Sequence, residues 1–403
     1  MSQTQQINPR VLAWARETAG FTVEEAAEKL ALGNTERVSA AEKLFALEAG
    51  QKAPTYSQLL KAASVYKRPL IAFYMANPPR EEERSEDFRT VGAAVSRREA
   101  GLLEALIRDV KARQQIVRSM LEDEDEAVRL PFVSSASIKQ TTSLVSNAIR
   151  TTLAITEADQ RTAKGPDRLF ALLRSAAERI GVFVLLLGDM GSPQSAISEQ
   201  VFRGFAIADD VAPFVVINDR DARTARSFTL IHELAHLWIG AGGVSGPVSQ
   251  ASTNSIERFC NDVAGEFLLP SQALESRFDL SDADAETVLQ ATQHLAQEWN
   301  VSQALVTYRF ARKRWISDAA AGEVFALLAT RWRREREKSR EDQADAGGPS
   351  YYVVRRSRLG TALLNVVRRG LQSDALTHTR AAKVLGVNPV SVGPLLLGPK
   401  RAA

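Results

Sequence analysis

The chain of 403 residues has few of the features on which several classes of protein depend. Its single cysteine cannot form an internal disulfide, which fits a reducing compartment. The sequence has no uninterrupted apolar run of membrane-spanning length, and its first ten residues contain no apolar signal region. We therefore expect a soluble, cytoplasmic protein with no membrane contact. Basic and acidic residues number 51 and 48, and this weak net charge gives no general attraction to nucleic acid.

Histidine is scarce as well, with four in the whole chain. Two of them, His232 and His236, lie in the segment 228–240 (FTLIHELAHLWIG), in which Glu233 is the only other titratable residue. As a helix this segment is hydrophobic on almost every side, which predicts that it is buried. Burying a carboxylate and two imidazoles costs several kcal/mol unless something pairs with them. A bound metal ion would remove that cost.

The spacing within this segment suits such an ion. Side chains four residues apart leave the same face of a helix, so His232 and His236 can bind one metal. Glu233 follows the first histidine directly, where its carboxylate can reach a reacting water and act as the base. This is the HExxH pattern of zinc metallopeptidases, and it predicts Zn²⁺ as the cofactor. The alternative is a core helix with two hydrogen-bonded histidines, which leaves the burial of Glu233 unexplained.

A catalytic zinc ion takes a third protein ligand, and the next predicted helix, residues 255–269, offers candidates. Glu257 and Glu266 are nine residues apart, about 180° round a helix, so only one can face the ion. Asn261 lies one turn after Glu257 on the same face, where its amide can orient a ligand histidine. We therefore predict Glu257 as the third ligand, with Glu266 or Asp262 as the alternatives.

The first part of the chain, residues 8–75, is predicted to be a run of short helices with clear start and stop signals. Their order resembles the XRE-type helix-turn-helix domain, whose third helix reads the major groove of DNA. The corresponding helix here, about 39–49, is poor in bases, which leaves Arg37, Lys43 and Lys52 as candidate DNA contacts. A helical module that binds another protein is the alternative.

Further along, the pattern predicts a helix over 97–128, helices over 134–180, and then three strands at 182–188, 201–208 and 212–219. Asp221 is expected to cap the helix that carries the two histidines. The fold class is therefore α+β and mostly helical, with a small sheet that leads into the HExxH helix, as in zincins. The predicted divisions are an XRE-like domain at 1–76, a helical linker or bundle at 77–180, a zincin-like peptidase at 181–330, and a charged linker with a helical C-terminal domain at 331–403.

The HExxH segment is followed about twenty residues later by the pattern ExxxCNxxAxExLLP, and together they resemble the ImmA/IrrE family of metallopeptidases. The likeness continues at 54–75, 87–90, 295–310, 351–367 and 379–387. The family pattern makes His232, His236 and Glu257 ligands and Glu233 the catalytic base. The resemblance also implies a cytoplasmic, sequence-selective endopeptidase that cuts a repressor protein and so controls transcription.

Two other readings of the sequence remain open. The chain could be a DNA-binding regulator whose metal site is sensory or structural, or the antitoxin of a toxin–antitoxin pair. Among the remaining side chains that could carry chemistry, His294 and His378 are expected on the surface, and Cys260 is expected to be a buried apolar filler. The basic stretches at 355–358 and 367–370 fit either DNA binding or simple exposure to solvent.

Overall fold

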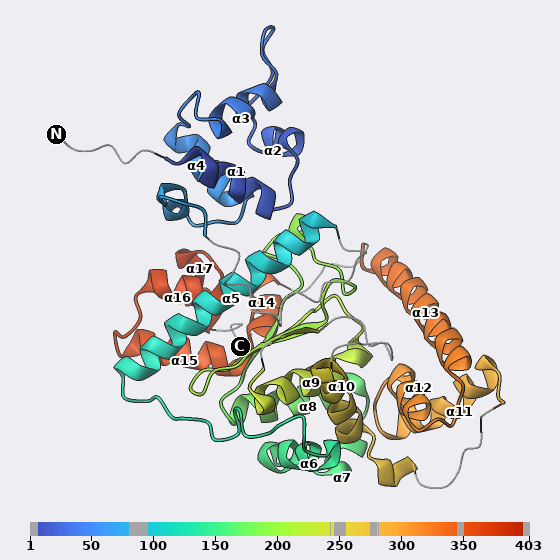
Figure 1. The fold of residues 1–403 in the computed structure, drawn as a ribbon. Coiled ribbons are helices and arrows are strands. Elements are labelled where there is room, and N and C mark those ends of the chain that lie inside the picture. The colour runs from blue at the N-terminus through green and yellow to red at the C-terminus, as the bar shows by residue number, and fades with distance from the viewer. Residues whose placement is uncertain are drawn as a thin grey trace. The chain divides into compact units, whose positions relative to one another are not determined.

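The structure is a computed structural model, and it describes residues 7–79, 96–241, 243–245, 255–274, 280, 282–344 and 350–397 (Figure 1). It is mostly helical with one small sheet, as the sequence predicts. The chain separates into two compact units, the first with residues 1–110 and 189–202 and the second with residues 111–188 and 203–403. The predicted division into four segments stays a prediction.

The first unit contains a bundle of short helices, and its helices begin where the sequence places their caps. These helices are α1 (Pro9–Thr18), α2 (Val23–Lys29), α3 (Ala40–Glu48), α4 (Tyr56–Val65) and the 3-10 helix η1 (Leu70–Tyr74). Thr22, Ser39 and Thr55 each form a capping box, with a side chain that accepts from the backbone three residues on. Gly20 and Gly50 end α1 and α3 with positive φ angles of 76° and 73°.

This bundle has an apolar core of its own, formed by residues such as Leu12, Leu44, Leu59 and Phe73. A buried ion pair crosses it, in which the Arg16 guanidinium donates to both carboxylate oxygens of Glu48 at 2.8 and 3.0 Å. Because both partners are nearly inaccessible to water, the pair fixes α1 against the end of α3. The arrangement is compatible with the helix-turn-helix prediction.

The long helix α5 (Arg97–Asp123) ends five residues earlier than the helix predicted over 97–128. The acidic run at 122–126 lies at its C-terminal end, where the helix dipole disfavours negative charge. The helix ends at Asp123, and Asp125 then takes a left-handed φ of 55°. The predicted helical stretch 134–180 is likewise interrupted, since only α6 (Thr142–Leu153), α7 (Glu157–Arg161) and α8 (Pro166–Arg179) are helical.

The sheet has four strands in the order β1-β3-β2-β4. The strands are β1 (Phe183–Leu186), β2 (Gly204–Ile207), β3 (Phe214–Ile217) and β4 (Gly243–Ser245). β1 pairs parallel with β3, whereas β2 is antiparallel to both β3 and β4. The first three strands lie within the predicted segments and are buried along their whole length. The sequence gives no sign of β4, which begins with the last glycine of a glycine-rich run.

Helix α9 (Arg226–Ile239) packs against β2 and β3 and against α8 and α10 (Ser255–Leu268). The prediction that Asp221 caps α9 is wrong: α9 follows directly after η5 (Arg223–Ala225) and has no side-chain cap. The Asp221 carboxylate instead accepts from the Ala222 amide at 2.7 Å, at the start of the 3-10 turn.

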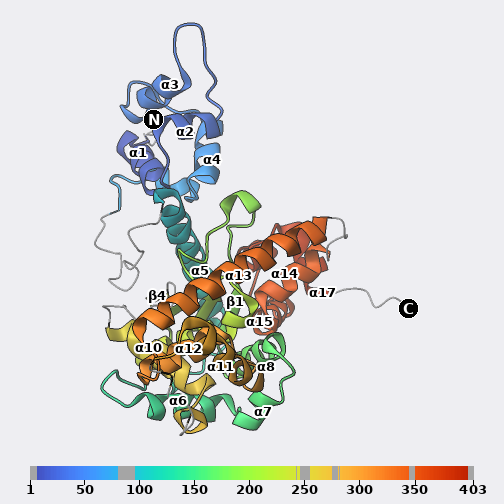
Figure 2. The same cartoon turned by 90° about the vertical axis from the view of Figure 1, so that its right-hand side faces the viewer.

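The rest of the second unit is helical. It includes η6 (Ser271–Leu274), α11 (Ala285–Glu298), α12 (Gln303–Arg312) and the long, charged α13 (Asp318–Ala344). The last four helices, α14 (Tyr351–Leu359), α15 (Thr361–Gln372), α16 (His378–Leu385) and α17 (Pro389–Leu397), gather into one group (Figures 1 and 2). Within the described residues, no helix has the length and apolar character that crossing a bilayer requires.

The group α14–α17 is fixed to the sheet side of the unit through α8. The Glu178 carboxylate accepts from the Thr361 and Ala362 amides at 3.0 and 3.1 Å, which caps the start of α15 from another helix. Arg174, one turn earlier in α8, donates to the Val184 carbonyl of β1 at 2.6 Å and to Glu178 at 3.1 Å. These bonds join α8, β1 and α15 into one packed body.

Candidate metal centre

The helix that carries the two histidines lies in the core along all but its terminal residues. Every residue from 227 to 238 in α9 is buried, as the apolar sequence predicts. The helix ends at Gly240, whose left-handed φ of 69° is the usual way to stop a helix. The segment after α5 closes this end: the Ser134 and Ala136 amides donate to the Leu237 and Trp238 carbonyls at 3.0 and 2.8 Å.

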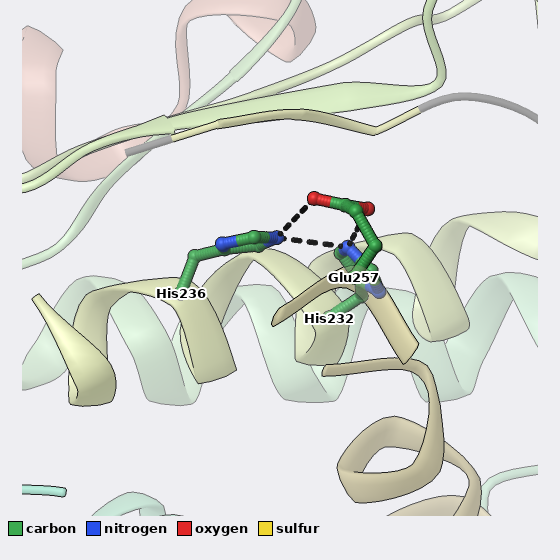
Figure 3. Close-up of side chains that lie close together, drawn as sticks. All are labelled: His232, His236 and Glu257. Atoms are coloured by element: carbon green, nitrogen blue, oxygen red, sulfur yellow. Dashed lines mark hydrogen bonds and ion pairs between the residues drawn. The ribbon is translucent and has the colours of Figure 1, made fainter. Parts of the chain in front are cut away.

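Three predicted residues converge above α9, and Figure 3 shows their side chains pointing toward one another. The Nε2 atoms of His232 and His236 are 3.1 Å apart. Glu257, from the first turn of α10, places Oε2 3.3 Å from the His232 Nε2 and Oε1 3.1 Å from the His236 Nε2. One ligand atom from each residue thus lies within 4.8 Å of the other two.

This spacing fits a metal ion. Bonds of about 2.0–2.1 Å in a tetrahedral site place neighbouring ligand atoms about 3.3 Å apart. The Nε2–Nε2 separation of 3.1 Å is close to that value. The two Glu257 distances, 3.3 and 3.1 Å, belong to different oxygens, and single ligand atoms of the three residues lie within 4.8 Å of one another, so the carboxylate would turn to bind an ion through one oxygen. Two imidazoles and one carboxylate are also the ligand set of many catalytic zinc sites.

The electrostatics of the group favour an ionised carboxylate. Burial by itself raises the pKa of Glu257, but hydrogen bonds and charge interactions with His232 and His236 outweigh it and hold the pKa well below the usual value of 4.5. A carboxylate that stays ionised at neutral pH is a suitable metal ligand. The Nδ1 atoms of both rings have no hydrogen-bond partner within the part of the chain that is described.

Glu233 is completely buried beside this group. It packs against β2 at Gly204, where a Cβ atom would lie 2.7 Å from the Glu233 Oε1, 2.7 Å from the Thr229 Cγ2 and 3.0 Å from the Val216 carbonyl oxygen. Only glycine leaves room for the carboxylate here. Sequence reasoning missed Gly204, although a glycine inside a strand is a known sign that another group approaches closely.

The other acidic candidates on α10 are engaged elsewhere. The Glu266 carboxylate accepts from Arg309 of α12 and from the Ser271 amide and hydroxyl at 3.0 and 2.8 Å. Asp262 accepts from the Tyr308 hydroxyl at 2.7 Å and from the Arg312 Nε at 2.8 Å. The structure therefore brings Glu257, and neither alternative, to the two histidines.

Asn261 and Cys260 also lie on α10, and both are buried. Because neither histidine Nδ1 has a partner among the described residues, Asn261 does not orient the rings through those atoms in this structure. Its role as a residue that supports the ligands stays a prediction. Burial raises the pKa of the Cys260 thiol, with smaller contributions from Glu257 and Glu233, in keeping with a neutral, apolar filler.

The remaining candidates lie outside this group. In the first unit, Arg37 and Lys52 are exposed, whereas the Lys43 ammonium donates to the Gly33 carbonyl at 2.9 Å. Helix α3 exposes Glu42 and a Phe45 side chain with 60% of its surface accessible, and neither suits a DNA groove. His294 and His378 lie on the surface of α11 and α16, as expected.

Comparison with known proteins identifies the domain that holds the group. No curated protein and no solved structure matches the chain. Residues 177–311 match the family model of the M78 peptidases, described as an IrrE N-terminal-like domain. The matched segment contains Glu233 and all three converging side chains, together with β1–β4 and α9–α12. This part of the chain is therefore similar to the metallopeptidases of the ImmA/IrrE type.

Proposed function

We propose that the chain is a zinc-dependent endopeptidase that cuts a repressor or another regulatory protein in the cytoplasm and so controls transcription. The observation that supports this most strongly is the convergence of two imidazoles and one carboxylate at separations of 3.1 to 3.3 Å. Three ligands is the number that catalytic zinc sites use, because a fourth position stays open for water or substrate.

In this proposal His232, His236 and Glu257 hold the ion. Zinc, when bound, supplies a Lewis acid that polarises a carbonyl and makes water more acidic. Glu233 accepts a proton on a carboxylate oxygen as water attacks the scissile carbonyl carbon. It then donates this proton to the departing amine nitrogen as the C–N bond breaks.

The sheet offers a place for the substrate backbone. β4 lies at one edge of the sheet, and it is in contact with α9, the helix of the two histidines. An extended peptide can add to such an edge as a further strand, with backbone hydrogen bonds that hold it beside the metal ligands. The cleavage site would then lie in an extended segment of the target protein.

The test compares the zinc-loaded wild type with Glu233→Gln. Each is incubated with a purified repressor encoded near its gene and with a library of unstructured peptides, and the products are identified by mass spectrometry. We expect cleavage at one site by the wild type, and no cleavage by the variant at an equal zinc content.

Equal cutting by both proteins would show that Glu233 is not the base. An intact repressor and intact peptides, together with tight binding of duplex DNA, would instead favour the regulator whose metal site is sensory or structural.

A further inference from the structure

The C-terminal group contains two helices joined in a way that does not serve the metal centre. Helix α16 ends at Gly386, whose left-handed φ of 61° lets its amide donate back to the Ala382 and Lys383 carbonyls. The Val387 amide also donates to Ala382, at 3.0 Å. Helix α17 begins at Pro389, so three residues separate the two helices. A short turn that contains glycine between two packed helices is one feature of helix-turn-helix motifs.

Packing around this turn supports the same reading. The inner faces of α16 and α17 bury Ala381, Ala382, Leu385, Val392 and Leu395. Small side chains on α16 allow close approach of its neighbour, and α15 packs on α16 as a third helix. The result is a three-helix core in which α17 is the last helix. Among the described residues, its outer side is open at Gly393, where an added Cβ would meet nothing within 4 Å, and at Val390 and Leu397, which are largely exposed.

The charge of this group is unlike that of the rest of the chain. Residues 350–397 contain seven Lys and Arg and a single acidic residue, Asp374. The N-terminal bundle at 7–79, whose helix order resembles a DNA-binding domain, contains nine bases and seven acids. A strongly basic local region is the electrostatic footprint of a nucleic-acid partner.

The structure also shows which of these charges are balanced. Arg358 pairs with Asp219 at 2.6 Å, and Arg369 pairs with Glu126 at 2.8 Å. Arg356 and Arg368 donate instead to the Leu396 carbonyl at the end of α17, at 3.3 and 2.9 Å. A carbonyl satisfies the donors but does not cancel a full positive charge, so these guanidiniums leave a positive field around α17.

Suitable side chains lie at the surface of both helices. Arg380 and Lys383 are exposed on α16 and, three residues apart, they lie on one face. Asn388 and Val390 are exposed where α17 begins, and 89% of the Val390 surface is accessible. In helix-turn-helix proteins the start of the second helix reaches the base edges, while the first helix crosses the phosphate backbone.

We propose that α16 and α17 form a duplex-DNA binding site, with α17 in the major groove. Arg380 and Lys383 contact phosphates. Asn388 binds an adenine edge and Val390 contacts a thymine methyl group, which are the base partners that an amide and an aliphatic side chain prefer. This site is independent of the proposed peptidase activity, and it places DNA binding at the opposite end of the sequence from the XRE-like bundle.

The first experiment measures binding of the full chain to a random-sequence 30-base-pair duplex by fluorescence anisotropy at several salt concentrations. We expect the double variant Arg380→Ala/Lys383→Ala to bind more weakly, and the slope of log affinity against log salt to fall by about two, one for each lost phosphate contact. The matched control is Arg37→Ala/Lys52→Ala in the N-terminal bundle, which should bind as the wild type does. Circular dichroism checks that both variants fold.

The second experiment selects preferred duplexes from a random library with the wild-type chain. We expect sites with adjacent A·T pairs, and a loss of preference for them of about tenfold in Asn388→Ala and in Val390→Ala. Glu233→Gln should select the same sites, because the metal centre plays no part. The proposal is overturned if the wild type does not bind duplex DNA, which would point to a protein partner for the exposed Val390. It is also overturned if the N-terminal pair of substitutions, rather than the pair on α16, removes binding.

Discussion

Replacing Gly204 by alanine tests how the fold positions Glu233, the proposed base of the candidate metal centre. This residue lies in β2 directly against the carboxylate of Glu233. The added methyl carbon would lie 2.7 Å from the Glu233 Oε1 and 2.7 Å from the Thr229 Cγ2, distances that real Cβ atoms essentially never show. Its third neighbour, the Val216 carbonyl oxygen at 3.0 Å, is part of the adjoining strand and cannot turn away. Either the carboxylate or the strand must move.

The size of the effect follows from this geometry. Restoring ordinary contact distances requires a shift approaching 1 Å, and a misplacement of that size at a catalytic group can cost about 100-fold in rate. We expect kcat of Gly204→Ala to fall by about that factor, while its zinc content stays at the wild-type level, because the three atoms nearest to the new methyl group belong to Glu233, Thr229 and Val216 and not to a proposed ligand. Overpacking of the core should also lower the free energy of unfolding by about 1–3 kcal/mol.

The assay compares kcat, zinc content and urea denaturation for the wild type, Gly204→Ala and Gly322→Ala. Gly322 is exposed on α13, where an added Cβ meets nothing within 4 Å, so this control should keep full activity and gain about 0.5–1 kcal/mol of helix stability. A second variant, Gly204→Ala/Thr229→Ser, removes the contact with the Thr229 methyl group but keeps the contact with Glu233, so it should recover part of the stability but not kcat. If Gly204→Ala retains kcat within threefold of the wild type, the proposed dependence of Glu233 on Gly204 is wrong.

Three further substitutions probe α10 and the attachment of the C-terminal helices. Glu257→Gln should weaken zinc binding more than about 100-fold in a competition titration with a chelator, since even groups that only orient ligands contribute 10- to 100-fold; unchanged binding would remove Glu257 from the ligand set. Glu266→Gln should keep wild-type zinc affinity but lower the free energy of unfolding by about 3 kcal/mol, because it leaves the buried Arg309 without its carboxylate. Burial raises the pKa of Glu266, but hydrogen bonds and charge interactions with Ser271 and Arg309 outweigh burial and hold this pKa below the usual 4.5. The ionised carboxylate therefore stabilises the fold fully above pH 4.5, and this stabilisation is lost as the pH falls through the lowered pKa. The difference in urea stability between wild type and Glu266→Gln should therefore shrink below pH 4.5, and a constant difference would contradict this. Glu178→Ala should lower the free energy of unfolding in urea by about 3 kcal/mol, and the backbone amides at the start of α15 should exchange their hydrogens faster. Amide exchange as slow as in the wild type would show that the Glu178 cap contributes little.

Much of the fold could be predicted because the signals are local. Thr22, Ser39 and Thr55 cap their helices through side chains that bond three residues away, and such bonds are visible in the sequence. The three apolar strands and the buried HExxH helix follow from continuous hydrophobic runs. Helical phase showed that only one of Glu257 and Glu266 could face the ion, and Asn261 on the same face favoured Glu257, which the structure places beside the histidines.

What could not be predicted depends on partners distant in the sequence. β4 pairs with β2, which precedes it by about forty residues, and its short glycine-containing sequence shows no strand pattern. Arg356 and Arg368 look like a free basic patch in the sequence, yet they bind carbonyls at the end of α17 some 28 to 40 residues away. The close approach of Gly204 and Glu233 likewise joins two residues whose contact exists only after folding.

The contacts between residues 132–136 and the C-terminal end of α9 limit where the domain can be cut. The segment around Ser134 supplies two amides to the last carbonyls of the helix, and the Phe132 ring stacks on Trp238 with centroids 4.4 Å apart. That segment begins more than forty residues before the matched region 177–311. A fragment trimmed to the family limits would leave two backbone acceptors and a large indole face exposed to water at the helix of the two histidines. We expect such a fragment to aggregate, and the shortest stable fragment with the proposed metal ligands to start upstream of residue 130.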